Sequence, residues 1–273
     1  MDRDKIIEQL KDDELYYGDF GKQFLSNSDL KYLKTEGSAK EFRSAKKFSP
    51  TELLNLELGR YFHQLMLEPD KAKDFPIVDV KTRNANEYKQ YLDDNNLEYA
   101  LRTSEAQDIK DLADWVLNPK SEYGSDIVRA LLNNPIALKE QPAIAELHGH
   151  MFKGKADLIT LDMDGQYVII DLKTTGSNPS DINIYRMRDF GYDTQCYLYK
   201  ELFGMDFKFI FFGKKQKVNE SGEIYYDIEE ITPSDQTIES GKMAVMNALA
   251  NYDKFFGEGA THDVRKSYTK RVI

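Results

Sequence analysis

Asp157, Asp171 and Lys173 fall within one stretch of the chain, Gly154 to Lys173, whose pattern predicts a β-hairpin. Side chains alternate along a strand, so Asp171 and Lys173 should share one face while Leu172 points into the core. Asp157 belongs to the neighbouring strand of the expected hairpin. We therefore expect two carboxylates and a lysine to project from adjacent strand ends, close enough to share a divalent cation.

The hairpin is predicted from three consecutive patterns. Residues 155–161 alternate polar and apolar side chains, residues 162–165 (Asp-Met-Asp-Gly) have turn chemistry, and residues 167–170 form an apolar, mostly β-branched run. The tripeptide Asp-Leu-Lys alone is compatible with a solvated hairpin end that has no chemical role. Asp157 on the adjoining strand favours a functional site.

Paired carboxylates beside a lysine are suited to metal-dependent chemistry on a phosphate. Mg²⁺ prefers oxygen ligands in near-octahedral geometry and keeps several waters, so one or two carboxylates suffice to hold it. The ion acts as a Lewis acid on a phosphoryl oxygen and lowers the pKa of a bound water. A neighbouring lysine can orient that water or offset the charge that develops on the phosphate.

A histidine lies on the helix with the best start signal in the chain. Ser49 is the expected N-cap, a proline follows it, and Glu52 occupies the capping-box position. This helix should end near Leu67 and carries His63 one turn after Gly59. Glycine costs a helix interior about 1 kcal/mol relative to alanine, so a close approach on that face is plausible. A lone helical histidine is usually a surface or packing residue, and the helix alone does not assign His63 a chemical role.

The other patterns complete an α/β protein, which we expect to be one domain. A short helix is expected over residues 37–47, with further helices over 86–97, 104–117, 125–134, 185–203 and 232–256, and with strands over 143–150, 207–212 and 224–231. The domain should comprise a mostly helical part (1–135), a catalytic sheet with its helices (140–256) and a flexible tail (258–273). His148 and His150 have a spacing that can bind metal, but no third soft ligand is evident nearby, which favours a structural or DNA-facing role.

The net charge of −10 argues against a general nucleic-acid coat, but it allows an enzyme that meets phosphate at a local basic groove. Candidate DNA contacts are four basic residues and one hydroxyl just past the expected catalytic strand: Lys153, Lys155, Arg186, Arg188 and Thr174. Each basic residue, taken alone, is also compatible with a solvated face.

Cysteine usage and hydropathy predict a cytoplasmic protein. The one cysteine, Cys196, excludes an internal disulfide and a cysteine-ligated cluster. No run approaches the ~20 apolar residues of a membrane span, and the first residues lack the apolar core of a signal peptide. We expect no membrane partner.

Four motifs, in order, resemble the PD-(D/E)xK nuclease superfamily, and within it the exodeoxyribonuclease VIII (RecE) type that phages and prophages use for recombination. They are LSNSDL at 25–30, LELGRYFHQLMLEP at 56–69, KAD…IIDLKTT at 155–175 and GYDTQCYLY at 191–199. The match covers residues 25 to 255, and its specificity comes from the order of the four motifs. It implies a restriction-endonuclease-like core, a central mixed sheet flanked by helices, with a helical region before it.

The resemblance also implies roles for matching residues. The metal ligands would be His63, Asp157, Asp171 and the backbone carbonyl of Leu172, and Glu146 would match a further acidic position that bears on one ion or two. Lys173 would position or activate the attacking water, and Gln195 and Tyr199 would line the site. The ion would be Mg²⁺, with Mn²⁺ as a substitute. The family's proline before Asp157 is absent here, and the lone cysteine excludes the relatives that carry an iron–sulfur cluster.

The implied activity is 5′→3′ digestion of linear duplex DNA by a ring-shaped trimer or tetramer in a bacterial or phage-infected cell. Its 3′ single-stranded tails would pass to a single-strand annealing protein. Alternatives are an endonuclease, a flap or single-strand nuclease, and a non-catalytic DNA-binding scaffold. Intact Asp157, Asp171 and Lys173 count against the scaffold, because an inactive homologue has no chemical reason to keep all three.

Overall fold

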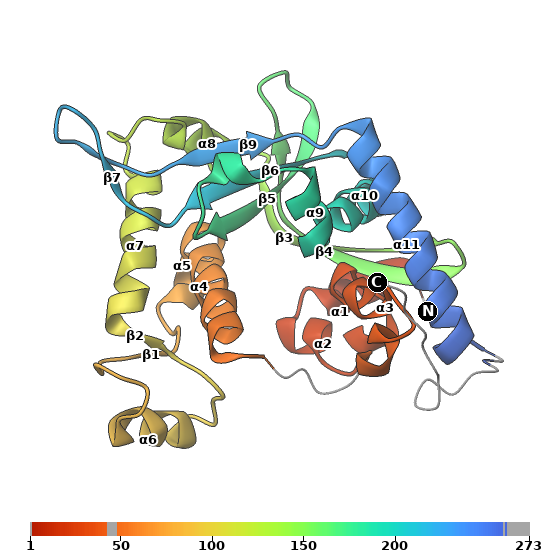
Figure 1. Cartoon of the computed structure of the whole chain (residues 1–273). Helices are drawn as coiled ribbons and strands as arrows, with labels where there is room; N and C mark the ends of the chain where they lie inside the picture. The colour runs from red at the N-terminus through yellow and green to blue at the C-terminus, as the bar shows by residue number, and fades with distance from the viewer. Residues whose placement is uncertain (1, 43–47, 259, 261–273) are drawn as a thin grey trace.

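A computed structural model describes residues 2–42, 48–258 and 260, and these residues contain a five-stranded mixed sheet of order β3-β4-β5-β6-β9 (Figure 1). The strands are β3 (Leu138–Leu147), β4 (His150–Leu161), β5 (Tyr167–Thr175), β6 (Asp206–Gly213) and β9 (Ile228–Ile231). β5 and β6 are parallel, and the other neighbours are antiparallel. The predicted α/β fold of the restriction-endonuclease type, with helices flanking a central mixed sheet, is confirmed.

The part of the chain before the sheet is mostly helical. It contains α1 (Arg3–Leu10), α2 (Asp13–Tyr17), η1 (Gly21–Gln23), α3 (Asn27–Leu33), η2 (Ser38–Glu41), α4 (Pro50–Leu67), α5 (Pro69–Ala72), α6 (Asn86–Asp94), α7 (Thr103–Leu117) and α8 (Ser125–Leu132). Two short strands, β1 (Ile77–Val78) and β2 (Leu101–Arg102), pair in parallel; β1 follows α5, α6 lies between the two strands in the chain, and α7 follows β2. Of the helix expected over 37–47, only the 3₁₀ turn η2 is seen, and residues 43–47 lie outside the described residues.

The second part of the chain adds helices to the sheet and a small hairpin beside it. Its elements are η3 (Pro179–Asp181), α9 (Ile184–Phe190), α10 (Tyr192–Phe203), α11 (Asp235–Phe256) and the hairpin of β7 (Lys217–Val218) with β8 (Ile224–Tyr225). None of the helices described is long and apolar enough to cross a membrane. Of the expected tail, residues 259 and 261–273 lie outside the described part of the chain.

Different helices cover the two faces of the sheet, and alternation along β5 assigns each residue to one face. Val168, Ile170 and Leu172 pack in the cluster that contains side chains of α4, α7 and α8, whereas Ile169 packs with side chains of α9 and α10 (Figure 1). Asp171 follows Ile169 by two residues and shares its face. The Asp171 carboxylate on β5 therefore faces α10, and the Leu172 side chain packs on the α4 side of the sheet.

α4 is fixed at its start and along its buried face. Ser49 Oγ accepts from the Glu52 N–H (3.3 Å), and the Glu52 carboxylate accepts from the Ser49 N–H (2.8 Å), which is the predicted capping box. Phe62 is fully buried, with its ring centroid 4.9 Å from that of Phe212 on β6. This contact holds the next residue, His63, beside the end of β5.

The LSNSDL motif joins the N-terminal helices to the sheet and to α10. The Leu25 N–H donates to the Met151 carbonyl (2.9 Å), and the Leu25 carbonyl accepts from the Lys153 N–H (2.8 Å). Asn27 Oδ1 accepts from the Thr194 hydroxyl at the start of α10 (2.6 Å). The motif thus places α1–α3 next to the strand that carries Asp157.

Two predicted elements are divided in the structure. The helix expected over 185–203 consists of α9 and α10, which separate at Gly191, where φ is 72°. That left-handed conformation favours glycine and ends α9. The strand expected over 224–231 is split between β8 and β9, which belong to different sheets. The final helix begins at Asp235, after the N-cap Ser234.

The expected strand over 143–150 is a hairpin, and this corrects the interpretation of its two histidines. β3 begins at Leu138, and the chain turns at His148 and Gly149, whose φ values are 53° and 79°. His148 Nε2 lies 2.8 Å from the Tyr197 hydroxyl, whereas His150 Nε2 lies 3.2 Å from Asp253 Oδ1. The two imidazoles bond to separate partners, so the predicted common strand face is wrong, and both contacts agree with the structural role that the sequence favoured.

Two helical glycines should respond in opposite ways to alanine. A Cβ at Gly241 would lie 2.0 Å from the Asp193 carbonyl oxygen, whereas a Cβ at Gly59 would meet nothing within 4 Å. We expect Gly241→Ala to lower the free energy of unfolding by about 1–3 kcal/mol through overpacking of α10 on α11. Gly59→Ala should raise it by up to about 1 kcal/mol through helix propensity. Urea unfolding of the two variants beside the wild type checks both signs, and stabilisation by Gly241→Ala would contradict the packing described.

Candidate metal centre and active-site cleft

Three carboxylates lie at one level across three adjacent strands. The β3–β4 pairs Lys139–Leu158 and Gln141–Ala156 flank the position at which Glu140 meets Asp157. The β4–β5 ladder ends with the pair Leu158 and Ile170, and the next position in that register holds Asp157 and Asp171. Directly opposed residues of antiparallel strands project to the same side and have Cβ atoms about 5 Å apart. Two strand registers thus bring together residues that are far apart in the sequence.

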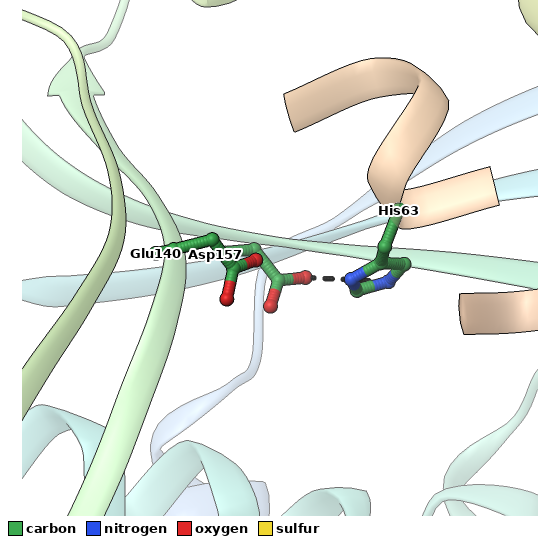
Figure 2. Close-up of side chains that lie close together, drawn as sticks. All are labelled: His63, Glu140 and Asp157. Atoms are coloured by element: carbon green, nitrogen blue, oxygen red, sulfur yellow. Dashed lines mark ion pairs between the residues drawn. The ribbon is translucent and has the colours of Figure 1, made fainter. Parts of the chain in front are cut away.

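His63 approaches this row from α4. Figure 2 shows its ring pointing from the helix toward Asp157 and Glu140 on the two strands. His63 Nε2 lies 2.6 Å from the Leu172 carbonyl oxygen and 3.5 Å from Asp157 Oδ2. One potential ligand atom from each of His63, Glu140 and Asp157 lies within 4.8 Å of the others. The imidazole, the two carboxylates and the backbone carbonyl therefore surround a common point.

Asp171 is held by two donors on the α10 side of the sheet. Gln195 Nε2 donates to Asp171 Oδ2 (2.5 Å), and the Lys173 ammonium pairs with Oδ1. Burial raises the pKa of Asp171 to about 6, although the attraction of Lys173 opposes the shift. Burial opposes the charge on Lys173 too, but the attraction of Asp171 and Asp157 raises its pKa above the usual range. Lys173 is therefore a cation at neutral pH.

Glu140 is a site residue that the sequence did not reveal. It occupies the left-handed region, with φ of 51°, which costs a non-glycine residue about 1–3 kcal/mol. Burial and the charge of Asp157 raise the pKa of Glu140 to about 7, while Lys155 opposes the shift. A strained backbone thus holds one carboxylate against another. A hairpin turn placed at His148 and Gly149 would have put Glu140 opposite Asp157, but Pro142 argues against a strand there.

Glu146 was predicted as a further acidic position, and the structure places it elsewhere. It pairs with Met151 next to the β3–β4 turn and is exposed. It is six residues along β3 from Glu140, or about 20 Å at the usual rise of a strand. Among the described residues, Glu140 holds the position on β3 that Glu146 was expected to fill.

Tyr199 and two of the predicted DNA-contact lysines form the wall of the site toward α2. The Tyr199 hydroxyl donates to the Lys155 carbonyl (3.1 Å) and so fixes β4 near Asp157. The Lys155 ammonium pairs with Asp13, and the Lys153 ammonium donates to the Tyr16 carbonyl. Lys153 and Lys155 are only 6% and 9% exposed, so both already have protein partners.

A cavity of about 870 Å³ opens over these groups. Its lining includes His63, the three carboxylates, Lys173, Gln195 and Tyr199. It also includes Lys22, Lys153, Lys155 and a set of aromatic side chains: Tyr16, Tyr17, Phe24, Tyr32, Phe42 and Phe48. The cavity therefore joins the carboxylate row to basic side chains of η1 and β4 and to aromatic side chains of residues 16–48.

The other predicted DNA contacts lie outside the lining of this cavity. Thr174 is half-buried near the end of β5. Arg186 Nη1 donates to Ser177 Oγ, and Arg188 Nε donates to Ser240 Oγ, each over 3.1 Å. Their contact with DNA stays a prediction.

The residues present fit a hard divalent cation. Carboxylate and carbonyl oxygens are the ligands that Mg²⁺ and Mn²⁺ prefer, and imidazole is a common metal ligand. Burial, and after it repulsion by Asp157, raises the pKa of Glu140, and a cation between the two carboxylates would relieve that repulsion. With Asp171, three carboxylates lie in this small region beside one imidazole.

A model of the PD-(D/E)XK nuclease superfamily matches residues 30–268. The chain belongs to this superfamily. Nucleases of the PD-(D/E)XK superfamily generally use divalent metals, in agreement with the donor set around His63, and they act on DNA. The chain is therefore a nuclease.

Comparison with solved structures supports the fold. The crystal structure named "Putative exonuclease" from Eubacterium rectale is 15% identical, with a TM-score of 0.56, and the match covers 96% of this chain and 95% of that one. A phage-related exonuclease from Haemophilus somnus is 16% identical, with a TM-score of 0.32 and coverage of 85% and 94%. At these identities the first likeness shows the fold alone, and the second carries no argument. No curated protein matches the chain.

Glu140→Gln should stabilise the metal-free protein at alkaline pH. The folded-state pKa of about 7 exceeds the usual 4.5, so ionisation of Glu140 lowers the free energy of unfolding as pH rises from about 4.5 to 7. Glutamine removes that loss, and we expect a gain of about 1–3 kcal/mol at pH 8 and a small one at pH 5. Thermal unfolding in EDTA at both pH values checks this, and an equal gain at both would contradict it.

Proposed function

We propose that the chain is a metal-dependent DNA exonuclease of the RecE type that digests linear duplex DNA from 5′ to 3′ and leaves 3′ single-stranded tails. The observation that carries the proposal is the convergence of His63, Glu140 and Asp157 beside the Asp171–Lys173 pair, at the floor of one cavity. The proposal includes Mg²⁺ as the ion, with Mn²⁺ as a substitute.

The protein's part in the reaction begins with holding the metal. His63, Asp157, Asp171 and the Leu172 carbonyl are the proposed ligands, and Glu140 joins them from β3. When bound, the divalent cation supplies Lewis-acid stabilisation of the phosphate and lowers the pKa of a water. The Leu172 N–H donates to Asp157 Oδ2 (2.8 Å), which fixes the orientation of that carboxylate before any ion binds.

Lys173 and Gln195 complete the proposed chemistry. The Lys173 side chain is 24% exposed and lines the cavity, so its ammonium can donate to the attacking water and to a phosphate oxygen. Gln195 holds the Asp171 carboxylate from α10, which keeps the ion-pair partner of Lys173 in place. Tyr199 acts through the β4 backbone at Lys155 and is a positioning residue.

The basic and aromatic part of the cavity lining supports a nucleic-acid end as the substrate. Aromatic faces stack on bases, and lysines attract the phosphate backbone, a combination typical of channels for unpaired strands. Tyr17, one of these aromatic residues, is 68% exposed. The proposed context is that of the RecE type: a ring of three or four copies in the cytoplasm of a bacterial or phage-infected cell, followed by a single-strand annealing protein.

Digestion of linear and closed circular duplexes tests the proposal. With Mg²⁺ or Mn²⁺ we expect loss of a linear 5′-labelled duplex as mononucleotides, survival of the circle, and no reaction in EDTA. Asp171→Ala and Lys173→Ala should each lower the rate at least ~100-fold, because each removes a group from the reacting centre.

Controls separate this reading from its alternatives. Lys200→Ala removes a lysine that pairs with Asp206 on the surface, and it should leave the rate unchanged. Cutting of the circle would favour an endonuclease, and release of the label only from unpaired ends would favour a flap or single-strand nuclease. DNA binding without any cutting would leave a scaffold and refute the catalytic proposal.

A further inference from the structure

Lys214 is a half-buried cation with no counter-charge in the described part of the chain. It follows the last residue of β6, and its ammonium donates to Asn55 Oδ1 on α4 (3.2 Å). No ion pair involves it among residues 2–42, 48–258 and 260. Burial lowers its pKa, with no neighbouring carboxylate to oppose the shift. An ammonium placed in this way can gain an anionic partner at little cost in desolvation.

The position of Lys214 connects it to the catalytic strand. Its N–H donates to the Thr175 carbonyl at the end of β5 (2.9 Å), two residues beyond Lys173. A Cβ at Gly176 would lie 4.0 Å from Lys214 Cε. The lysine therefore flanks the loop into which the catalytic strand runs.

The face of α4 between His63 and Asn55 carries no side chain. Asn55, Gly59 and His63 are spaced by four residues and share one side of the helix. His63 reaches Leu172 at one end of this face, and Asn55 reaches Lys214 at the other, about 12 Å along the helix axis. A Cβ at Gly59 would meet nothing within 4 Å, so packing within the protein does not require glycine there.

We propose that this surface, formed by Asn55, Gly59 and Lys214, binds the sugar-phosphate backbone of the DNA strand that is cut. Lys214 and Asn55 hold a phosphate a few nucleotides from the bond being hydrolysed, and the backbone passes close to the helix at Gly59. The inference rests on the proposed nuclease function and adds a second point of attachment outside the cavity.

The chemistry of the three residues suits a phosphodiester strand. Asn55 gives its side-chain oxygen to Lys214, which leaves its amide N–H groups to donate to a phosphate oxygen. Lys214 supplies the charge, and Gly59 removes the side chain that would keep the strand away from the helix. None of these groups addresses a base edge, so binding here is independent of sequence.

The test measures binding of a fluorescein-labelled 30-base-pair duplex in EDTA over a range of NaCl concentrations, and digestion of the same duplex in Mg²⁺. Lys214→Gln keeps most of the side-chain stem but removes the charge. It should reduce the slope of log affinity against log salt by about one phosphate contact. KM should rise about 3- to 10-fold while kcat stays within about twofold, since each phosphate contact binds substrate and transition state alike. Lys200→Gln, on a paired surface lysine, is the matched control and should change neither quantity.

Gly59 provides a second, independent readout. Gly59→Ala should raise the melting temperature and weaken DNA binding, and Gly59→Gln should weaken it further. A loss of affinity in a stabilised variant cannot come from misfolding. If wild type cuts DNA while Lys214→Gln and Gly59→Gln keep its KM and salt slope, this inference fails and the nuclease proposal stands. If wild type neither binds nor cuts DNA, the nuclease proposal itself fails, and the inference fails with it.

Discussion

The register of β3, β4 and β5 is the constraint on which the candidate site depends. It aligns Glu140, Asp157 and Asp171 in one row, although each ionised carboxylate disfavours ionisation of its neighbours. A slip of one residue would turn these side chains to the opposite face and bring apolar ones to the cleft. Asp171 disfavours the slip, because it would move the carboxylate into the apolar cluster that holds Ile170 and Leu172.

α4 adds the group that the strands cannot supply. Its buried residue Phe62 packs on Phe212 of β6, which places His63 at the level of Leu172. Packing on the far side of the sheet thus decides where an imidazole meets carboxylates on three strands. The capping box at Ser49 and Glu52 fixes where the helix begins, and therefore how far His63 lies along it. The spacing between cap and histidine is as much a part of the site as the histidine.

The sequence predicted the parts of the site that depend on local patterns. The hairpin carrying Asp157 and Asp171 follows from alternation and a turn, and the helix of His63 follows from its cap. The sequence did not reveal Glu140, because its place depends on a strand register and on a proline-containing strand that local rules disfavour. The position of Glu146 and the expected common face of His148 and His150 were wrong for a related reason: a turn at Gly149 lies inside the segment expected to be one strand.

In the cleft, the negative side chains and the positive side chains each lack enough neighbouring charge of the opposite sign within the described part of the protein. Burial and the neighbouring charge of Asp157 raise the pKa of Glu140 to about 7, so the carboxylate row is short of positive charge. On the same strand as Asp157, burial lowers the pKa of Lys153 to about 8; Asp29 opposes the shift, and the nearby cations Lys155 and Lys22 add to it. A bound cation alone would relieve the repulsion between the carboxylates, and a bound anion alone would stabilise the charge on Lys153. A divalent metal that carries a phosphate relieves both at once, which is why an acidic chain can still attract DNA to this one place.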